Sequence, residues 1–163
     1  MAELGHVSRG NCAAEQDCTA SPLRAMLLAL LATVAADQML PLSGWPPEPW
    51  NLLGLAPLAA GVALASFADV QFKRAGTAVK PFVPASALVT DGVFRVSRNP
   101  MYLGLALVLA GAALLLGSVP ALVVAPAYAA WVGSRFIVRE ERQLAAQFGD
   151  AYSAYRAGTR RWF

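Results

Sequence analysis

A charge-free run over residues 99–134 constrains the fold of this chain more than any other feature of its sequence. The run contains no Asp, Glu, Lys or Arg. A helix needs about 20 mostly apolar residues to cross a bilayer. The run is therefore long enough for two short spans if it breaks at Gly117-Ser118-Val119-Pro120, because glycine and proline interrupt helices. We predict a helical hairpin that crosses the membrane twice.

Two further apolar blocks precede the hairpin. Residues 23–42 predict a first span and residues 50–68 a second, with a turn rich in proline, glycine and tryptophan between them. A cleaved signal peptide is the alternative for the first block, but apolar residues resume beyond it, which favours an uncleaved span. Hydrophobic residues make up 57% of the chain and charged residues 14%, whereas soluble domains carry about 45–50% and about 25%.

The predicted fold is all-α: a polytopic membrane protein with about four transmembrane helices in a single domain over residues 22–163. Residues 1–21 are polar and uneven in composition, and we expect a flexible tail. His6, Cys12 and Cys18 all lie in this tail. Two cysteines fall short of the four ligands of a structural zinc site, so no metal is expected.

The basic residues indicate how the chain is oriented. All 13 Lys and Arg residues precede the first span, lie between the second and third, or follow the fourth. Basic loops stay on the cytosolic side, so we predict a multi-pass protein with both termini in the cytosol. After the fourth span, Leu144, Phe148, Tyr152 and Tyr155 recur at spacings of four, four and three. This spacing predicts a C-terminal amphipathic helix, which lies on the bilayer or folds over the cytosolic ends of the spans.

Two polar clusters flank the predicted hairpin. The first, Arg98-Asn99-Pro100-Met101-Tyr102, stands where a helix begins, since proline suits the first helical turn. The second, residues 135–142, holds two adjacent glutamates among arginines. The first cluster has a simpler interpretation as a basic membrane anchor, and the second has one as a set of weak surface ion pairs. The hairpin brings both clusters to one membrane face, which favours a polar binding pocket. Residues 72–81 lack the spacing of a nucleotide-binding loop.

The motifs of the second half of the chain resemble those of a known family. Three stretches resemble the isoprenylcysteine carboxyl methyltransferase family. They are Leu88-Val89-Thr90-Asp91-Gly92-Val93-Phe94, Arg98-Asn99-Pro100-Met101-Tyr102-Leu103-Gly104, and Glu140-Glu141 followed by Leu144, Phe148-Gly149, Tyr152 and Tyr155. That family is related to the phospholipid N-methyltransferases. The resemblance covers about residues 70–163. It implies an integral membrane enzyme that uses S-adenosylmethionine and methylates a lipophilic or lipidated acceptor, with membrane lipids around it and no nucleic-acid partner.

The resemblance also implies which residues form the site. The cofactor would be lined by Ser86, Ala87, Leu88, Val89, Phe94, Asn99, Pro100, Met101, Tyr102 and Glu140. The substrate would be bound by Arg135, Arg139 and Glu141, and Phe136 stands where eukaryotic members have a substrate-binding arginine. Asn99 replaces the usual histidine of Arg-His-Pro, which excludes a histidine base there.

The chemistry leaves two acceptors open. A carboxylate is already ionised at neutral pH and needs no base, which suits carboxyl O-methylation. A phospholipid amine is the alternative acceptor, and it must first lose a proton. A small transporter or a scaffold is a third possibility. Asp37, near the outer end of the first span, is the single intramembrane acid, which argues against proton-coupled transport.

Overall fold

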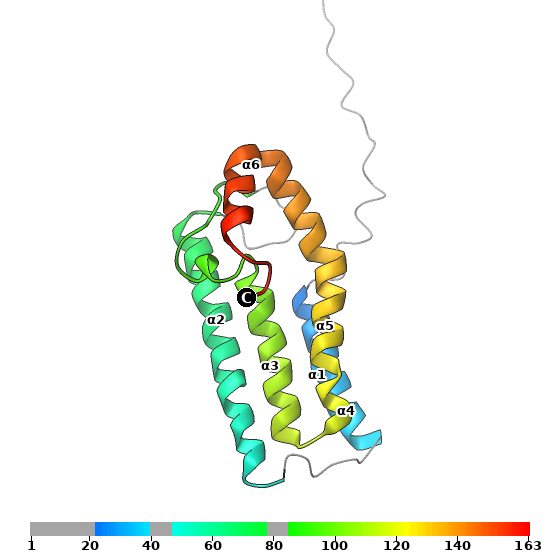
Figure 1. Cartoon of the computed structure of the whole chain (residues 1–163). Helices are drawn as coiled ribbons and strands as arrows, with labels where there is room; N and C mark the ends of the chain where they lie inside the picture. The colour runs from blue at the N-terminus through cyan, green and yellow to red at the C-terminus, as the bar shows by residue number, and fades with distance from the viewer. Residues whose placement is uncertain (1–21, 40–46, 78–84) are drawn as a thin grey trace, which may run out of the picture.

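The computed structural model describes residues 22–39, 47–77 and 85–163, and every element assigned within these ranges is a helix. The predicted flexible tail, residues 1–21, and most of the turn after the first span lie outside the described residues. The all-α prediction is confirmed for the described part of the chain. Figure 1 shows a bundle of long helices with a bent helix over one end.

The predicted spans correspond to helices in the structure. Helix α1 covers Pro22–Met39, and a short 3-10 helix, η2 (Trp50–Gly54), leads into α2 (Leu55–Arg74). Helix α3 covers Pro100–Leu116. Among the described residues, three helical segments are long and apolar enough to cross a membrane, namely Pro22–Met39, Trp50–Arg74 and Val119–Gly158. The 17 residues of α3 are at the lower limit for a span.

The predicted hairpin is confirmed. Helix α3 ends at Gly117, whose φ of 62° places it in the left-handed region that favours glycine. The chain then turns through Ser118 into α4 (Val119–Leu122), which has a proline in its first turn, and continues into α5 (Val124–Val132). Helices α3 and α5 pack against each other, so the two arms of the hairpin lie side by side.

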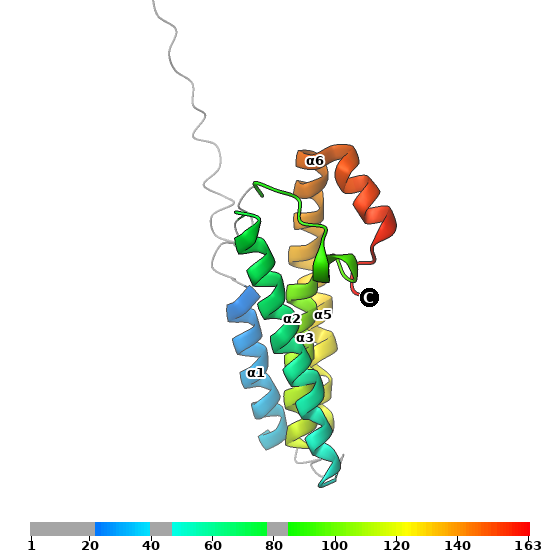
Figure 2. The same ribbon diagram turned by 90° about the vertical axis from the view of Figure 1, so that its left-hand side faces the viewer.

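Helix α3 is the centre of the bundle, with α2 on one side and α1 and α5 on the other (Figures 1 and 2). Glycines allow α2 and α3 to approach closely. A Cβ atom built on Gly104 would lie 2.6 Å from the carbonyl oxygen of Gly61, and one on Gly111 would lie 2.7 Å from that of Gly54. Such small residues at a helix interface are typical of membrane proteins. The outward faces stay apolar: Leu28 and Leu31 are each 66% exposed.

The fourth span continues without interruption into the C-terminal helix. A π-helical turn, η4 (Gly133–Ile137), joins α5 to α6 (Val138–Gly158). Helix α6 is sharply kinked at Gly149, which has a φ of 51° and a ψ of −120°. Of the two placements expected for the C-terminal segment, the structure has the one in which it folds back over the span ends, and it does so through this kink. The predicted face is the less exposed side of this helix, with Leu144, Phe148 and Tyr155 half-buried and Tyr152 buried, although the kink redirects the second half (Figure 1).

Candidate active site

The predicted site gathers at one end of the bundle, where α2 ends, α3 begins and η4 passes into α6. We call it the polar end. Proline occupies the first turn of α3, and Pro100 is completely buried there. The approach to this helix contains a short 3-10 helix, η3 (Gly92–Arg95), in which Phe94 is buried. The ring of Phe94 meets that of Phe72 edge-on, with centroids 4.9 Å apart. The end of α2 therefore supports the segment that leads into α3.

Tyr102 and Glu140 connect the two arms of the hairpin. The Tyr102 hydroxyl donates a hydrogen bond of 2.6 Å to Oε1 of Glu140. Tyr102 lies in the first turns of α3 and is 8% exposed, while Glu140 lies in the first turn of α6. A bond to a carboxylate is stronger than one between neutral groups. The structure thus joins two of the predicted cofactor-binding residues directly, across two elements far apart in the sequence.

Glu141 is held by two arginines. Nε and Nη2 of Arg161 donate to the two carboxylate oxygens, at 3.0 and 2.6 Å. Nη2 of Arg98 lies 3.4 Å from Oε1 of the same carboxylate. The hydrogen bond to Glu141 raises the pKa of Arg161 above its usual value. The buried carboxylate therefore has its charge balanced within the protein, in the fork geometry that arginine favours.

The C-terminal tail closes over the start of α3. The backbone N–H of Arg98 donates to the carbonyl oxygen of Arg160 at 3.0 Å. The Ser97 hydroxyl and the Asn99 side-chain amide both donate to the carbonyl oxygen of Arg161, at 3.2 and 3.1 Å. Trp162 packs against the hydrophobic core. These bonds fix the backbone of the Arg98-Asn99-Pro100 motif from outside the bundle.

The Ser86–Val89 segment joins the site through other contacts. Ser86 is tied to the end of α2, because its N–H donates to the Thr77 hydroxyl at 3.1 Å and its hydroxyl donates to the Gly76 carbonyl at 2.9 Å. The Gln147 amide donates to the carbonyl oxygen of Ala85, next to this segment. Ala87, Leu88 and Val89 are half-buried, as is Met101 in α3. This part of the predicted cofactor site therefore approaches α6 beyond the Tyr102–Glu140 pair.

The three residues predicted to bind substrate differ in their surroundings. Arg135, in the π-helical turn, and Arg139, in the first turn of α6, are exposed. Glu141 is buried between Arg98 and Arg161. The two exposed arginines have the chemistry to bind a carboxylate or a phosphate. Glu141 forms structural ion pairs, and its predicted contact with substrate stays a prediction.

Arg98 has capacity for a further partner. Its side chain is only 10% exposed, yet its Nε and Nη1 atoms are buried without a hydrogen-bond partner among the residues that the structure describes. Leaving buried donors unpaired is costly. A bound anion at this point would satisfy them. The polar end therefore combines a carboxylate, Glu140, with a cation that has donors to spare.

Sequence reasoning missed the part that the C-terminal residues play. Tyr155 donates a 2.7 Å hydrogen bond to the carbonyl oxygen of Phe94, and Arg161 pairs with Glu141. The helix face containing Tyr152 and Tyr155 was predicted, but the return of the tail after Gly158 had no signal in the spacing. The basic and aromatic run Arg160-Arg161-Trp162 directly after a helix end was the available hint.

The predicted residues of this site lie within a range that matches a family of known proteins. The family model described as phospholipid methyltransferase matches residues 50–151, a range that includes every predicted site residue. Comparisons with curated proteins and with solved structures gave no match. The resemblance inferred from the motifs is confirmed at the level of related families, because the isoprenylcysteine enzymes are relatives of the matched one. The chain belongs to the phospholipid methyltransferase family.

Proposed function

We propose that this protein is an S-adenosylmethionine-dependent membrane methyltransferase that acts on a lipophilic acceptor, with carboxyl O-methylation of the isoprenylcysteine type as its reaction. The hydrogen bond between Tyr102 and Glu140 is the observation that supports this most strongly. It joins two of the three motifs that carry the resemblance, within the range matched by a methyltransferase family.

The residues at the polar end fit the proposed cofactor. The Nε and Nη1 atoms of Arg98, which have no hydrogen-bond partner among the described residues, suit the carboxylate of an amino acid, and the Glu140 carboxylate suits its ammonium group. The aromatic faces of Phe94 and Tyr102 suit a cationic sulfonium. When bound, S-adenosylmethionine supplies a methyl group from its sulfonium sulfur. The protein's task is then to orient the reactants and exclude water.

A carboxylate acceptor matches the groups available near the site. Asn99 cannot take up a proton, and the sole histidine of the chain, His6, precedes the described residues. A carboxylate acceptor needs no base, because it is ionised at neutral pH. Arg135 and Arg139 are exposed beside Glu140 along the same helical path, where they are placed to attract the acceptor carboxylate.

N-methylation of a phospholipid amine is the second candidate. The family model that matches the chain is described as phospholipid methyltransferase, and this description directly favours N-methylation of a phospholipid. An amine acceptor must lose a proton before it reacts, and Glu140 is the carboxylate in position to accept one. The Tyr102 hydroxyl already donates to Glu140, so this reaction requires that carboxylate to serve two partners.

The charge distribution supports a cytosolic location for the polar end. Lys73, Arg74, Arg98, Arg135 and the arginines of α6 all lie there, as the positive-inside rule requires of the cytosolic face. We therefore place both termini in the cytosol. In this orientation the cofactor enters from the cytosol, and a lipophilic acceptor arrives from the membrane between the spans.

Purified protein incubated with methyl-tritiated S-adenosylmethionine and a total membrane lipid extract tests the reaction. Lipid-soluble label that is released by mild base indicates a methyl ester and is the expected result. Base-stable label in an amine lipid would establish the second candidate instead. Absence of any labelled lipid, from folded protein with an extract of its host membrane, would contradict both.

A further inference from the structure

The side-chain amide of Gln71 lies at the polar end of the bundle, on the α2 side. Gln71 is in the last turn of α2, and its Oε1 atom is buried without a hydrogen-bond partner among the residues that the structure describes. A buried acceptor that stays unpaired is costly. Its retention at this place therefore indicates a donor that the described residues do not supply.

Gln71 packs directly against the segment predicted to line the cofactor. A Cβ atom built on Gly92 would overlap the Gln71 amide, so this close approach requires a glycine. Gly92 also has a φ of 59°, in the region that glycine favours. The next residue of α2, Phe72, meets the ring of Phe94 edge-on. Two consecutive side chains of α2 thus contact η3, where the predicted cofactor segment ends.

The acidic side chain of the same segment faces water. Nη2 of Arg95 lies 3.0 Å from Oδ1 of Asp91, and the two side chains are 76% and 80% exposed. An ion pair this exposed is well solvated and weak. The buried acceptor beside Gly92 is therefore the neutral amide oxygen of Gln71, and the carboxylate of the motif is turned away from it.

The polar groups of S-adenosylmethionine differ between its two halves. The methionine half has a carboxylate and an ammonium group, which suit Arg98 and Glu140 at the starts of α3 and α6. The adenosyl half has neutral donors, the adenine amine and the ribose hydroxyls. A neutral amide oxygen is a good acceptor for such donors. Gln71 belongs to a third element, α2, and thus supplies an acceptor that the two charged residues do not.

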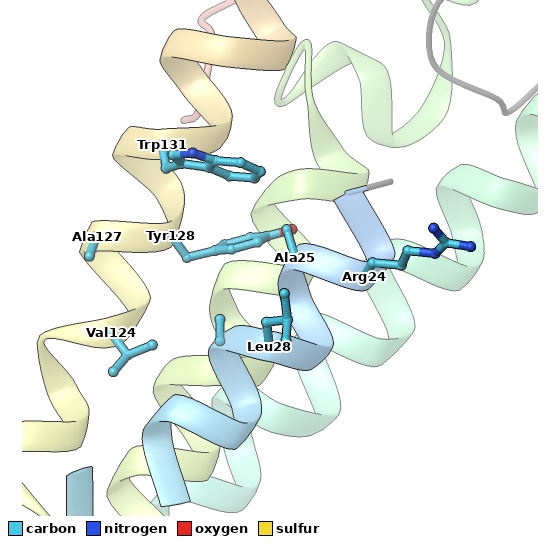
Figure 3. A pocket seen from close by; sticks show the side chains of 8 residues that line it. Arg24, Ala25, Leu28, Val124, Ala127, Tyr128 and Trp131 are labelled. Carbon is cyan, nitrogen blue, oxygen red and sulfur yellow. The ribbon is translucent and has the colours of Figure 1, made fainter. Parts of the chain in front are cut away.

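The cavity between α1 and α5 is not suited to the adenosyl half. It has a volume of about 510 Å³, and Leu28 and Trp131 are among the residues that line it. Figure 3 shows that the Arg24 side chain extends away from it, and the Tyr128 hydroxyl already donates to the carbonyl oxygen of Pro22. Its wall is therefore largely apolar, and polar donors buried there would lose their hydrogen bonds to water.

We propose that Oε1 of Gln71 accepts a hydrogen bond from the adenosyl half of the bound cofactor, donated by the adenine amine or by a ribose hydroxyl. This inference rests on the proposed use of S-adenosylmethionine and adds a binding residue that lies outside the three motifs of the resemblance. Gly92 contributes by having no side chain, because the amide can then reach the cofactor segment.

Ligand analogues separate a direct contact from general support of the fold. The reference probe is S-adenosylhomocysteine, the cofactor without its methyl group. Three altered probes have hypoxanthine in place of adenine or lack one or the other ribose hydroxyl. Calorimetry in detergent gives the Kd of each probe for the wild type and for Gln71→Met, which keeps the side-chain length and removes the amide. Gln38→Met is the control, because Gln38 is exposed near the end of α1.

We expect one altered probe to bind the wild type and Gln38→Met about tenfold less tightly than the reference probe, since it leaves Oε1 unpaired. That probe identifies the donor. Gln71→Met should bind this probe and the reference probe with nearly equal Kd. A structural role alone would weaken all probes alike and leave their ratios unchanged.

Unchanged ratios in Gln71→Met would overturn the proposal and leave the amide as a support for Gly92 with water at Oε1. A wild type that binds all the probes equally would overturn it too. If Gln71→Met does not fold, Gln71→Ala is measured in the same way, with the same outcomes. A folded wild type that binds no S-adenosylhomocysteine would refute the proposed cofactor itself, which is a separate failure.

Discussion

The Tyr102 hydroxyl and the Glu140 carboxylate are joined by a 2.6 Å hydrogen bond between the first turns of α3 and of α6. The bond links the two arms of the hairpin at the polar end. Its short length is typical of a hydroxyl that donates to an ionised acceptor. Because Tyr102 also packs in the hydrophobic core, the pair holds the Glu140 carboxylate at a defined place beside buried, apolar surroundings.

Loss of either partner should weaken cofactor binding. Tyr102→Phe and Glu140→Gln should each raise the Kd for S-adenosylmethionine about tenfold or more, since a hydrogen bond to a charged group contributes about 1.5–3 kcal/mol and a tenfold change corresponds to about 1.4 kcal/mol. The double variant should be less impaired than the sum of the two effects, because both changes break one interaction. Calorimetric titration measures the Kd of the wild type, of the two single variants and of the double variant.

Glu48→Gln is the matched control for the Glu140 change. Glu48 is exposed beside η2, at the opposite end of the bundle, so its substitution should leave the Kd unaltered. Fully additive effects of Tyr102→Phe and Glu140→Gln would show that the two side chains act on the cofactor independently. That result would contradict the coupled pair.

Arg161 should stabilise the polar end although it lies beyond the range matched by the family. Arg161→Ala leaves the buried Glu141 carboxylate with Arg98 as its remaining partner, and we expect a loss of about 1–3 kcal/mol in unfolding free energy. The neighbouring Arg160 contributes only its backbone carbonyl to the contacts described above. Arg160→Ala should therefore be near neutral. Thermal unfolding in detergent compares the two, and equal stabilities would refute the role of the ion pair.

The close contact between α2 and α3 predicts that Gly61 tolerates no side chain. A Cβ atom there would clash with the backbone carbonyl of Gly104, so Gly61→Ala should cost about 1–3 kcal/mol through overpacking. Gly158 has open space around its position for a Cβ atom, and Gly158→Ala serves as the control. Unfolding of each variant in the same detergent measures the difference. A Gly61→Ala protein as stable as the control would mean that the two helices are less closely packed than described.

The proposed orientation predicts which loops are accessible from outside the cell. With Cys12 and Cys18 replaced by serine, a cysteine introduced at Glu48 should react with a membrane-impermeant maleimide in intact cells. A cysteine at Thr159 should react only after the membrane is permeabilised. The reverse pattern of labelling would place the polar end outside and contradict access of the cofactor from the cytosol.

The hairpin and the start of α3 could be predicted because each depends on local chemistry. Gly117 supplies the left-handed residue that ends α3, and Pro100 is suited to a first helical turn. The hairpin then brings the start of α3 and the start of α6 to the same end of the bundle, where Tyr102 meets Glu140. These features need no knowledge of distant packing, so the sequence pattern was sufficient.

The closing of the C-terminal tail could not be predicted because it depends on a backbone conformation and on long-range pairing. A glycine within a helical pattern is compatible with a continuous helix as well as with a kink, and only the structure shows that Gly149 turns the chain back. The pairing of Arg161 with Glu141 follows from that turn. The sequence alone is equally consistent with Glu141 binding a substrate and with Glu141 pairing with an arginine.

Titration of S-adenosylmethionine into the purified wild-type protein tests the central claim most directly. The protein should first be shown to be folded in detergent, by a cooperative thermal transition. Calorimetry should then give saturable binding, with about one cofactor per chain, that is lost or strongly weakened in the Glu140→Gln variant. A folded wild-type protein that releases no heat of binding and remains unchanged in thermal stability at millimolar cofactor would contradict the claim that the polar end is a methyl-donor site.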